Sequence, residues 1–160
     1  MHEKEQEISD RDLEIVEGEF VKISQSRVRS AEGGHIEMEQ VCALSVDGEK
    51  IEVAQGAAAL ITGDDITMNQ SFGIIVAGND TKLNYSCVPV SLTKENASLK
   101  KSAAGIIAAG NVKVENSAAF LVLAKNIEGN INTLFDWKSA AAFGAVLGGV
   151  WGMLTLFRRR

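Results

Sequence analysis

Hydrophobic and polar residues recur along this chain with a period of fifteen residues. A six-residue pattern of the form apolar–any–apolar–any–polar–small starts at residues 21, 36, 51, 66, 81, 97, 112 and, in a degenerate copy, 127. Each step is fifteen residues except one of sixteen, whose extra residue falls in the segment 93–96. A second column fixes the same register through Gly18, Gly33, Gly48, Gly63 and Gly78. Because Ile8 precedes Ile23 by fifteen residues, we also expect a first, incomplete coil to begin near Gln6.

This period predicts an all-β fold, a single-stranded β-solenoid of about eight fifteen-residue coils over residues 21–135. One coil cannot bury its own apolar side, but stacked coils pair their strands and build a continuous core. Helical repeats need about thirty residues or more per unit, so the period excludes them. We expect the glycines to supply the positive φ angles of the turns. The handedness and a triangular or flattened cross-section stay open.

The two halves of each coil differ in their patterns. The half that begins with Ile51 alternates apolar and polar residues, as a strand with one side in water does. The other half is apolar on both sides in the segments 57–61, 72–76, 103–109 and 118–124. Its outward side needs a cover, namely a second subunit, the C-terminal segment or lipid, unless small residues leave a tolerated surface. The candidate interaction face consists of Phe72, Ile74, Ile75, Ile106, Ile107, Phe120 and Val122.

The C-terminal segment 136–160 predicts an apolar α-helix that spans or enters a membrane. Its uncharged stretch, 139–157, would be about 28 Å long as a helix, close to a hydrocarbon core of about 30 Å. Aromatic and basic residues flank the stretch, and small residues four apart form a face for close helix packing. These membrane-contacting and helix-packing residues are Trp137, Ala140, Gly144, Gly148, Trp151, Gly152 and Arg158. A helix that caps the solenoid is the alternative, although a cap normally keeps a polar side.

The charge of the chain, −5 overall, is concentrated at its start, where residues 1–20 form an acidic N-terminal segment. This acidic surface argues against nucleic-acid binding, which requires basic groups beside the phosphates. The segment has no apolar stretch typical of a signal peptide, so we expect the solenoid to remain in the cytoplasm. Arg158–Arg160 conflict with that orientation, since basic residues favour the cytoplasmic side. We interpret residues 1–20 as a partly ordered, charged cap on the first coil, with a disordered tether as the alternative.

No pattern in the sequence predicts catalysis, a cofactor or a metal ion. His35 occupies a turn position and has no second ligand at metal-binding spacing. Cys42 and Cys87 share a column three coils apart, beyond disulfide reach, and are interpreted as small core residues. Calcium-binding β-helices use a nonapeptide pattern that is absent here. The serines that recur before the apolar half are interpreted as a structural corner.

The glycine-punctuated apolar coils over residues 21–130 resemble the bactofilins, the polymer-forming cytoskeletal proteins of bacteria. The resemblance implies a small β-helix without catalytic residues that self-associates and in some members associates with membranes. The chain departs from that family in its shorter coils and its C-terminal helix, and no functional residues are carried over. We therefore expect a self-associating scaffold in a membrane, the bacterial inner membrane, that binds lipid, further copies of itself and possible membrane-protein partners. The alternative is a non-catalytic subunit of a membrane complex.

Overall fold

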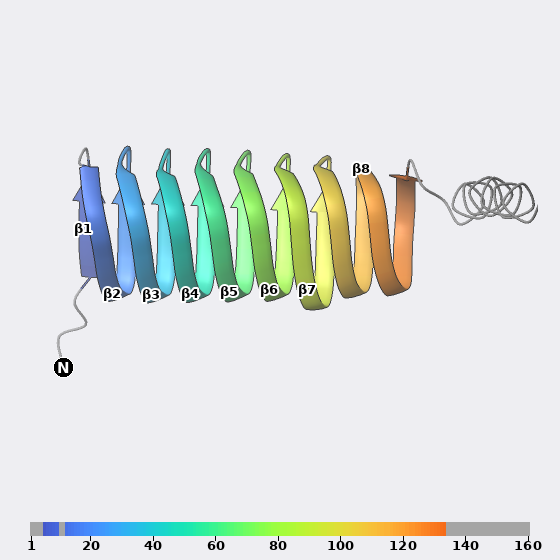
Figure 1. Ribbon diagram of the computed structural model, residues 1–160, viewed down its shortest axis with the longest axis horizontal. Helices are drawn as coiled ribbons and strands as arrows, with labels where there is room; N and C mark the ends of the chain where they lie inside the picture. Colours follow the sequence, from blue (N-terminus) through green and yellow to red (C-terminus); the bar gives the residue numbers. More distant parts are fainter. Residues whose placement is uncertain (1–4, 10–11, 134–160) are drawn as a thin grey trace, which may run out of the picture.

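The chain forms a parallel β-solenoid whose coils stand side by side from the N-terminal to the C-terminal end (Figure 1). The computed structural model describes residues 5–9 and 12–133, with side chains described over residues 12–129. These residues make about seven turns of one sheet, in which each strand is parallel to the next in the chain. The strands are β1 (Glu5–Ser9), β2 (Asp12–Ser24), β3 (Arg27–Glu39), β4 (Cys42–Ala54), β5 (Ala57–Asn69), β6 (Phe72–Asn84), β7 (Cys87–Lys100) and β8 (Ala103–Thr133).

The fifteen-residue register of the sequence is the pairing register of the sheet. In the pairing of β4 with β5, for example, Ile51 lies beside Ile66 and Gly48 beside Gly63. Among the strand pairs from β1–β2 to β7–β8, the register shifts only at β7, where Gly78 pairs with Thr93 but Asp80 pairs with Asn96. The extra residue therefore lies in segment 93–96, as predicted. The expected early coil is also confirmed, because Ile8 in β1 pairs with Ile23 in β2.

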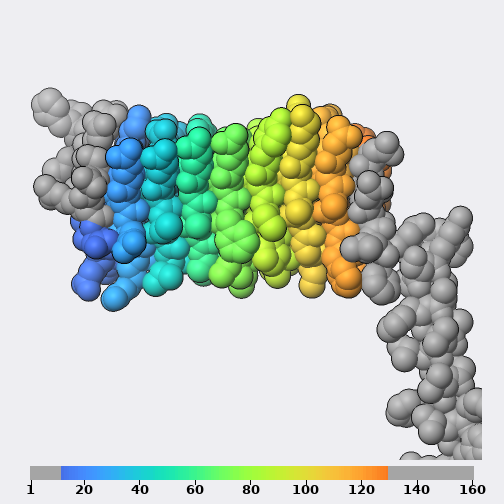
Figure 2. Space-filling view, turned by 90° about the horizontal axis from the view of Figure 1, so that it is seen from above, coloured from blue at the N-terminus to red at the C-terminus, as the bar shows by residue number. Residues whose placement is uncertain are grey.

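Like residues stack on one another inside the solenoid and form its core. Ile36, Ile51 and Ile66 follow one another in a single fully buried column. Each such side chain contributes about 1.5–3 kcal/mol relative to exposure, so stacking stabilises the rod coil by coil. Figure 2 shows the coils as successive bands of side chains packed without gaps. The degenerate last copy is different: Ile127 is 49% exposed, and about seven turns are described where the sequence predicted about eight.

The glycine column holds the coils at close spacing and does not supply positive φ angles. A Cβ atom added to Gly63 would lie 2.5 Å from the carbonyl oxygen of Gly48, and one added to Gly78 would lie 2.8 Å from that of Gly63. Among the described glycines only Gly129 has a positive φ. The prediction that the glycine turns need positive φ is therefore wrong. The column excludes side chains because the backbone of the preceding coil occupies the space of a Cβ atom.

Positive φ angles occur instead at a second column, which we call the glutamine corner. Each coil turns sharply at one residue with φ near +50°, in the region that L-residues other than asparagine and aspartate seldom adopt. Hydrogen bonds between side-chain amides join the first four members from coil to coil at 3.2–3.3 Å. The members of the glutamine corner are Gln25, Gln40, Gln55, Gln70, Tyr85, Lys101 and Asn116.

Candidate interaction surface

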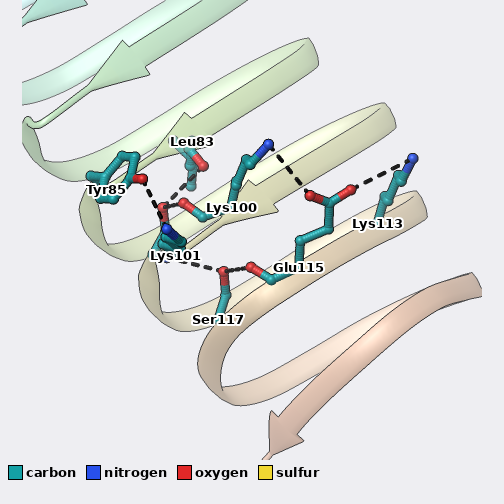
Figure 3. Close-up of polar contacts among 8 residues, drawn as sticks. Leu83, Tyr85, Lys100, Lys101, Lys113, Glu115 and Ser117 are labelled. Carbon is teal, nitrogen blue, oxygen red and sulfur yellow. Dashed lines mark hydrogen bonds and ion pairs between the residues drawn. The ribbon is translucent and has the colours of Figure 1, made fainter.

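A column of buried serines supports the glutamine corner from inside. The Ser86 hydroxyl donates to the Asn84 carbonyl oxygen at 2.8 Å and accepts a hydrogen bond from the Ser71 backbone N–H at 3.2 Å. Ser102 and Ser117 repeat this arrangement in the next coils. Figure 3 shows Ser117 beside the carbonyl oxygen of Glu115. Each hydroxyl therefore satisfies backbone groups that the turn removes from the ladder. The interpretation of the serines as a structural corner is confirmed.

The alternating half of each coil presents a charged face. Lys100 and Lys113 both lie beside Glu115, at 3.6 and 3.9 Å (Figure 3). The closest pair joins the Lys50 ammonium group to Glu52 at 2.8 Å. Its hydrogen bond, assisted by the opposite charges, lowers the pKa of the Glu52 carboxyl and raises the pKa of Lys50. These exposed groups keep this side of the rod hydrated.

The opposite side of the coils carries an uncharged surface, which we call the apolar face. It consists of the outward side chains of segments 42–45, 57–60, 72–75, 87–90, 103–106 and 118–121. The pairings of Leu60 with Ile75, Ile75 with Val90 and Val90 with Ile106 make one continuous apolar column. Ser45 is the single polar residue among these side chains, and none is charged. The largest apolar patch on a protein surface is often a functional site.

The structure brings most of the predicted interaction residues onto this face. Phe72, Ile74, Ile75, Ile106 and Phe120 are all at least 39% exposed. Two others lie elsewhere. Ile107 is fully buried in the core, and Val122 is partly buried against the core.

A bend in each coil explains the position of Ile107. In β6, Ile74 and Ile75 are both exposed, so the in–out alternation shifts by one residue between them. The next residue, Val76, is consequently buried, and Ile107 occupies the same column in the following coils. Strict alternation, which a flat strand follows, does not apply across such a bend.

Sequence reasoning missed other members of the apolar face. Leu44 is 60% exposed and Leu60 is 39% exposed, each in the same columns as the predicted residues. Their coils contain fewer bulky residues, so the apolar pattern is weaker there, although alignment of the coils in columns predicts both positions. The polar end of these columns lies in β2 and β3, where Arg29 forms an ion pair with Glu14 at 3.8 Å.

The two cysteines also belong to the apolar face. Cys42 and Cys87 are both free and exposed, so their interpretation as core residues is wrong. The side chains of Val41 and Ser86, which precede the two cysteines, point into the core. Side chains alternate between the two sides of a strand, so those of Cys42 and Cys87 point outward. They lie in one column and are separated by Ala57 and Phe72.

The described residues provide little chemistry beyond these surfaces. No group of three His, Cys, Asp or Glu side chains within them could hold a metal ion. His35 stacks on Phe20 with ring centroids 5.8 Å apart and lies 3.3 Å from Glu37. An open groove of about 1120 Å³ follows the glycine column, with Asp47 and Asp64 toward one end and Lys94 toward the other. These polar groups share no arrangement of nucleophile, base and oxyanion donors.

The predictions for the C-terminal segment lie outside the described residues. They concern Trp137, Ala140, Gly144, Gly148, Trp151, Gly152 and Arg158. Within the part of the chain that the structure describes, no helix is long and apolar enough to cross a membrane. The membrane helix therefore stays a prediction from the sequence.

Comparison with known proteins adds no relative to this description. The chain matches no protein-family model, no curated protein and no solved structure.

Proposed function

We propose that this protein is a non-catalytic scaffold that its C-terminal segment anchors in a membrane and that self-associates through the apolar face of its solenoid. The observation that carries the proposal is the apolar face itself. On the apolar face, the outward side chains of six consecutive coils carry no charge, while the other side of these coils carries Lys–Glu pairs. A surface of this kind is typical of sites of protein association.

The membrane part of the proposal is supported by the amino-acid sequence alone. Residues 139–157 carry no charge and are followed by three arginines, as a membrane helix with basic flanks would be. An anchor would also concentrate the protein in two dimensions and so strengthen a weak contact between copies. The resemblance to bactofilins agrees with self-association, and the acidic start of the chain agrees with a role away from nucleic acid.

A non-catalytic subunit of a membrane complex is the second candidate. The same apolar face would then bind a different protein, and the protein alone would stay monomeric in the membrane. What favours self-association is the regular repeat of the face, because its columns continue unbroken through six coils and match the repeat of another copy.

Flotation and subunit counting test both parts of the proposal. The full chain should float with lipid vesicles, and a variant that ends at residue 135 should not. Single-molecule photobleaching of the full chain in vesicles should show two or more copies per spot. Ile74→Glu should reduce this to one copy, because it places a charge in the apolar face. Lys82→Glu, on the opposite side of β6, is the matched control and should leave the count unchanged. A full chain that stays in the soluble fraction, or that is monomeric in vesicles, contradicts the proposal.

A further inference from the structure

Within the described residues, charge bounds the apolar face at its β2–β3 end. In β2 and β3 the columns that contain Leu44 and Cys42 begin with Asp12, Glu14, Arg27 and Arg29. From Cys42 to Leu121 these columns contain no charged residue. The face therefore has a direction along the rod, and this direction restricts how a second copy can lie on it.

Two symmetric arrangements bring such a face against its own copy. In a parallel pair, each coil meets the same coil of the partner, so the Arg27 and Arg29 side chains of both copies meet at one end. Like charges opposite each other are unfavourable. In an antiparallel pair centred between β6 and β7, each Arg27 and Arg29 lies beyond the last apolar coil of the other copy. Among the described residues, only the antiparallel arrangement keeps these like charges apart.

The sizes of the outward side chains favour the same arrangement. In a parallel pair, the two-fold axis runs along the rod and exchanges the columns, so Phe72 would meet Ile74 of the same coil in the partner subunit. Two bulky side chains would then hold the faces apart. In the antiparallel pair, Phe72 meets Cys87 and Ile74 meets Pro89, so that bulky side chains meet smaller ones. This large-against-small pairing is confined to the centre, because at the two ends Leu44 meets Phe120 and both side chains are bulky. Packing of large against small side chains is how paired sheets interdigitate at a separation of about 10 Å.

We propose that two copies of this chain pair through the apolar face with their rods antiparallel and the coils of β6 and β7 at the centre. This inference rests on the proposed function, because it specifies the geometry of the self-association. The chain continues beyond Thr133 at one end of each rod. An antiparallel pair therefore leads its two C-terminal segments out at opposite ends, and a pair anchored by both segments lies along the membrane.

The small area of the apolar face determines whether the pair can form in free solution or only in a membrane. Six coils at about 4.8 Å spacing extend over about 24 Å, and the outward columns cover about 10 Å across the strands. The footprint is thus on the order of 300 Å² per copy, below the roughly 800 Å² per partner of stable complexes. Pairing is weak in free solution and becomes effective where copies are concentrated in a membrane.

Cysteine cross-linking in vesicles tests the geometry with the full chain. The background variant Cys42→Ser/Cys87→Ser removes both exposed thiols of the apolar face. In this background, Leu44→Cys/Phe120→Cys should give a covalent dimer with a short bismaleimide, joined between position 44 of one copy and 120 of the other. The two positions are five coils, about 24 Å, apart within one chain and cannot be bridged there. For the same reason, Leu44→Cys alone should give no dimer in an antiparallel pair.

The possible outcomes separate the inference from the proposed function. A dimer formed by Leu44→Cys alone, as readily as by the double variant, shows a parallel pair and overturns the inference. Oligomers by photobleaching without any 44–120 cross-link, in variants that keep the thermal midpoint of the background, also overturn it and leave the scaffold function intact. A monomer by photobleaching for every variant and for the unchanged chain contradicts both.

Discussion

The glutamine corner and the apolar face lie next to each other on the six coils of the apolar face, yet they use their exposed positions in opposite ways. At the corner, amide side chains bond from coil to coil, and serines satisfy the turn from inside. On the apolar face, bulky side chains such as Ile74 are exposed and uncharged. The change occurs within two residues, since Ser86 is buried and Cys87 is exposed. The corner stabilises the solenoid, whereas the face is available for association.

The largest effect should come from a change that separates the coils and so disturbs both regions. Gly63→Ala places a Cβ atom 2.5 Å from the Gly48 carbonyl oxygen, and the coils must move apart to accommodate it. We expect the free energy of unfolding to fall by about 3 kcal/mol or more, measured by chemical denaturation. Thr62→Ala, the exposed neighbouring position, is the control and should change it by less than about 0.5 kcal/mol. Equal effects of the two substitutions would show that the glycine column does not set the spacing.

A smaller loss of stability should distinguish two adjacent residues, Ser86 in the buried serine column and Cys87 on the apolar face. Ser86→Ala leaves the buried backbone N–H of Ser71 without its acceptor, so we expect a loss of about 1–3 kcal/mol in unfolding free energy. Cys87→Ala changes an exposed side chain of the apolar face and should alter that value by less than about 0.5 kcal/mol. Denaturation curves of both variants under one condition make the comparison. If Cys87→Ala is the more destabilising, the apolar face contributes to folding and the assignment of roles is wrong.

Backbone strain at the glutamine corner gives the next prediction. Gln55 has a φ of +53°, where a β-branched residue is strongly disfavoured. Gln55→Ile should therefore destabilise the solenoid by about 1–2 kcal/mol. Gln55→Asn should be nearly neutral, because asparagine tolerates this region and retains an amide for the ladder. Thermal unfolding of the two variants provides the test, and a neutral Gln55→Ile would mean that the turn relaxes without cost.

Substitutions on the charged face should change the free energy of unfolding least. The Lys50 ammonium group lowers the pKa of Glu52, so the pair stabilises the folded state above the ordinary pKa of a glutamate. That stability is lost as the pH falls through the lowered pKa of the folded state. Both groups are exposed, and salt screens their interaction. Glu52→Gln should change stability only slightly at neutral pH and low salt, and not at all in acid. A Glu52→Gln effect as large as that of Ser86→Ala would refute this ranking.

The repeat made most of the solenoid predictable from sequence. The fifteen-residue repeat along the chain predicts the register, the extra residue in segment 93–96 and the pairing of Ile8 with Ile23. The conformation inside the coil was less accessible. Gln55 takes the positive φ that glycine would be expected to take, while Gly63 is required by the neighbouring coil. A constraint between coils cannot be distinguished from one within a coil by sequence alone.

The candidate surface was predictable in its character and less so in its limits. The non-alternating pattern predicts the exposure of Ile74 and Ile106, but it also predicts that of Ile107, because the sequence gives no sign of the bend between successive exposed residues. Cys42 and Cys87 were placed in the core because small thiols are commonly buried. The turn that precedes each cysteine determines which of the following side chains point outward, and the side chains of Cys42 and Cys87 are among them.

The two native thiols allow the most direct measurement of self-association through the apolar face. The full chain is reconstituted in vesicles at high and at low protein density, and the rate at which maleimide modifies Cys42 and Cys87 is followed by mass spectrometry. We predict slow modification at high density, faster modification on dilution into more lipid, and fast modification of Ile74→Glu at both densities. Rates that are the same at high and low density, or protection that persists on dilution, would contradict the claim that a second copy covers this face.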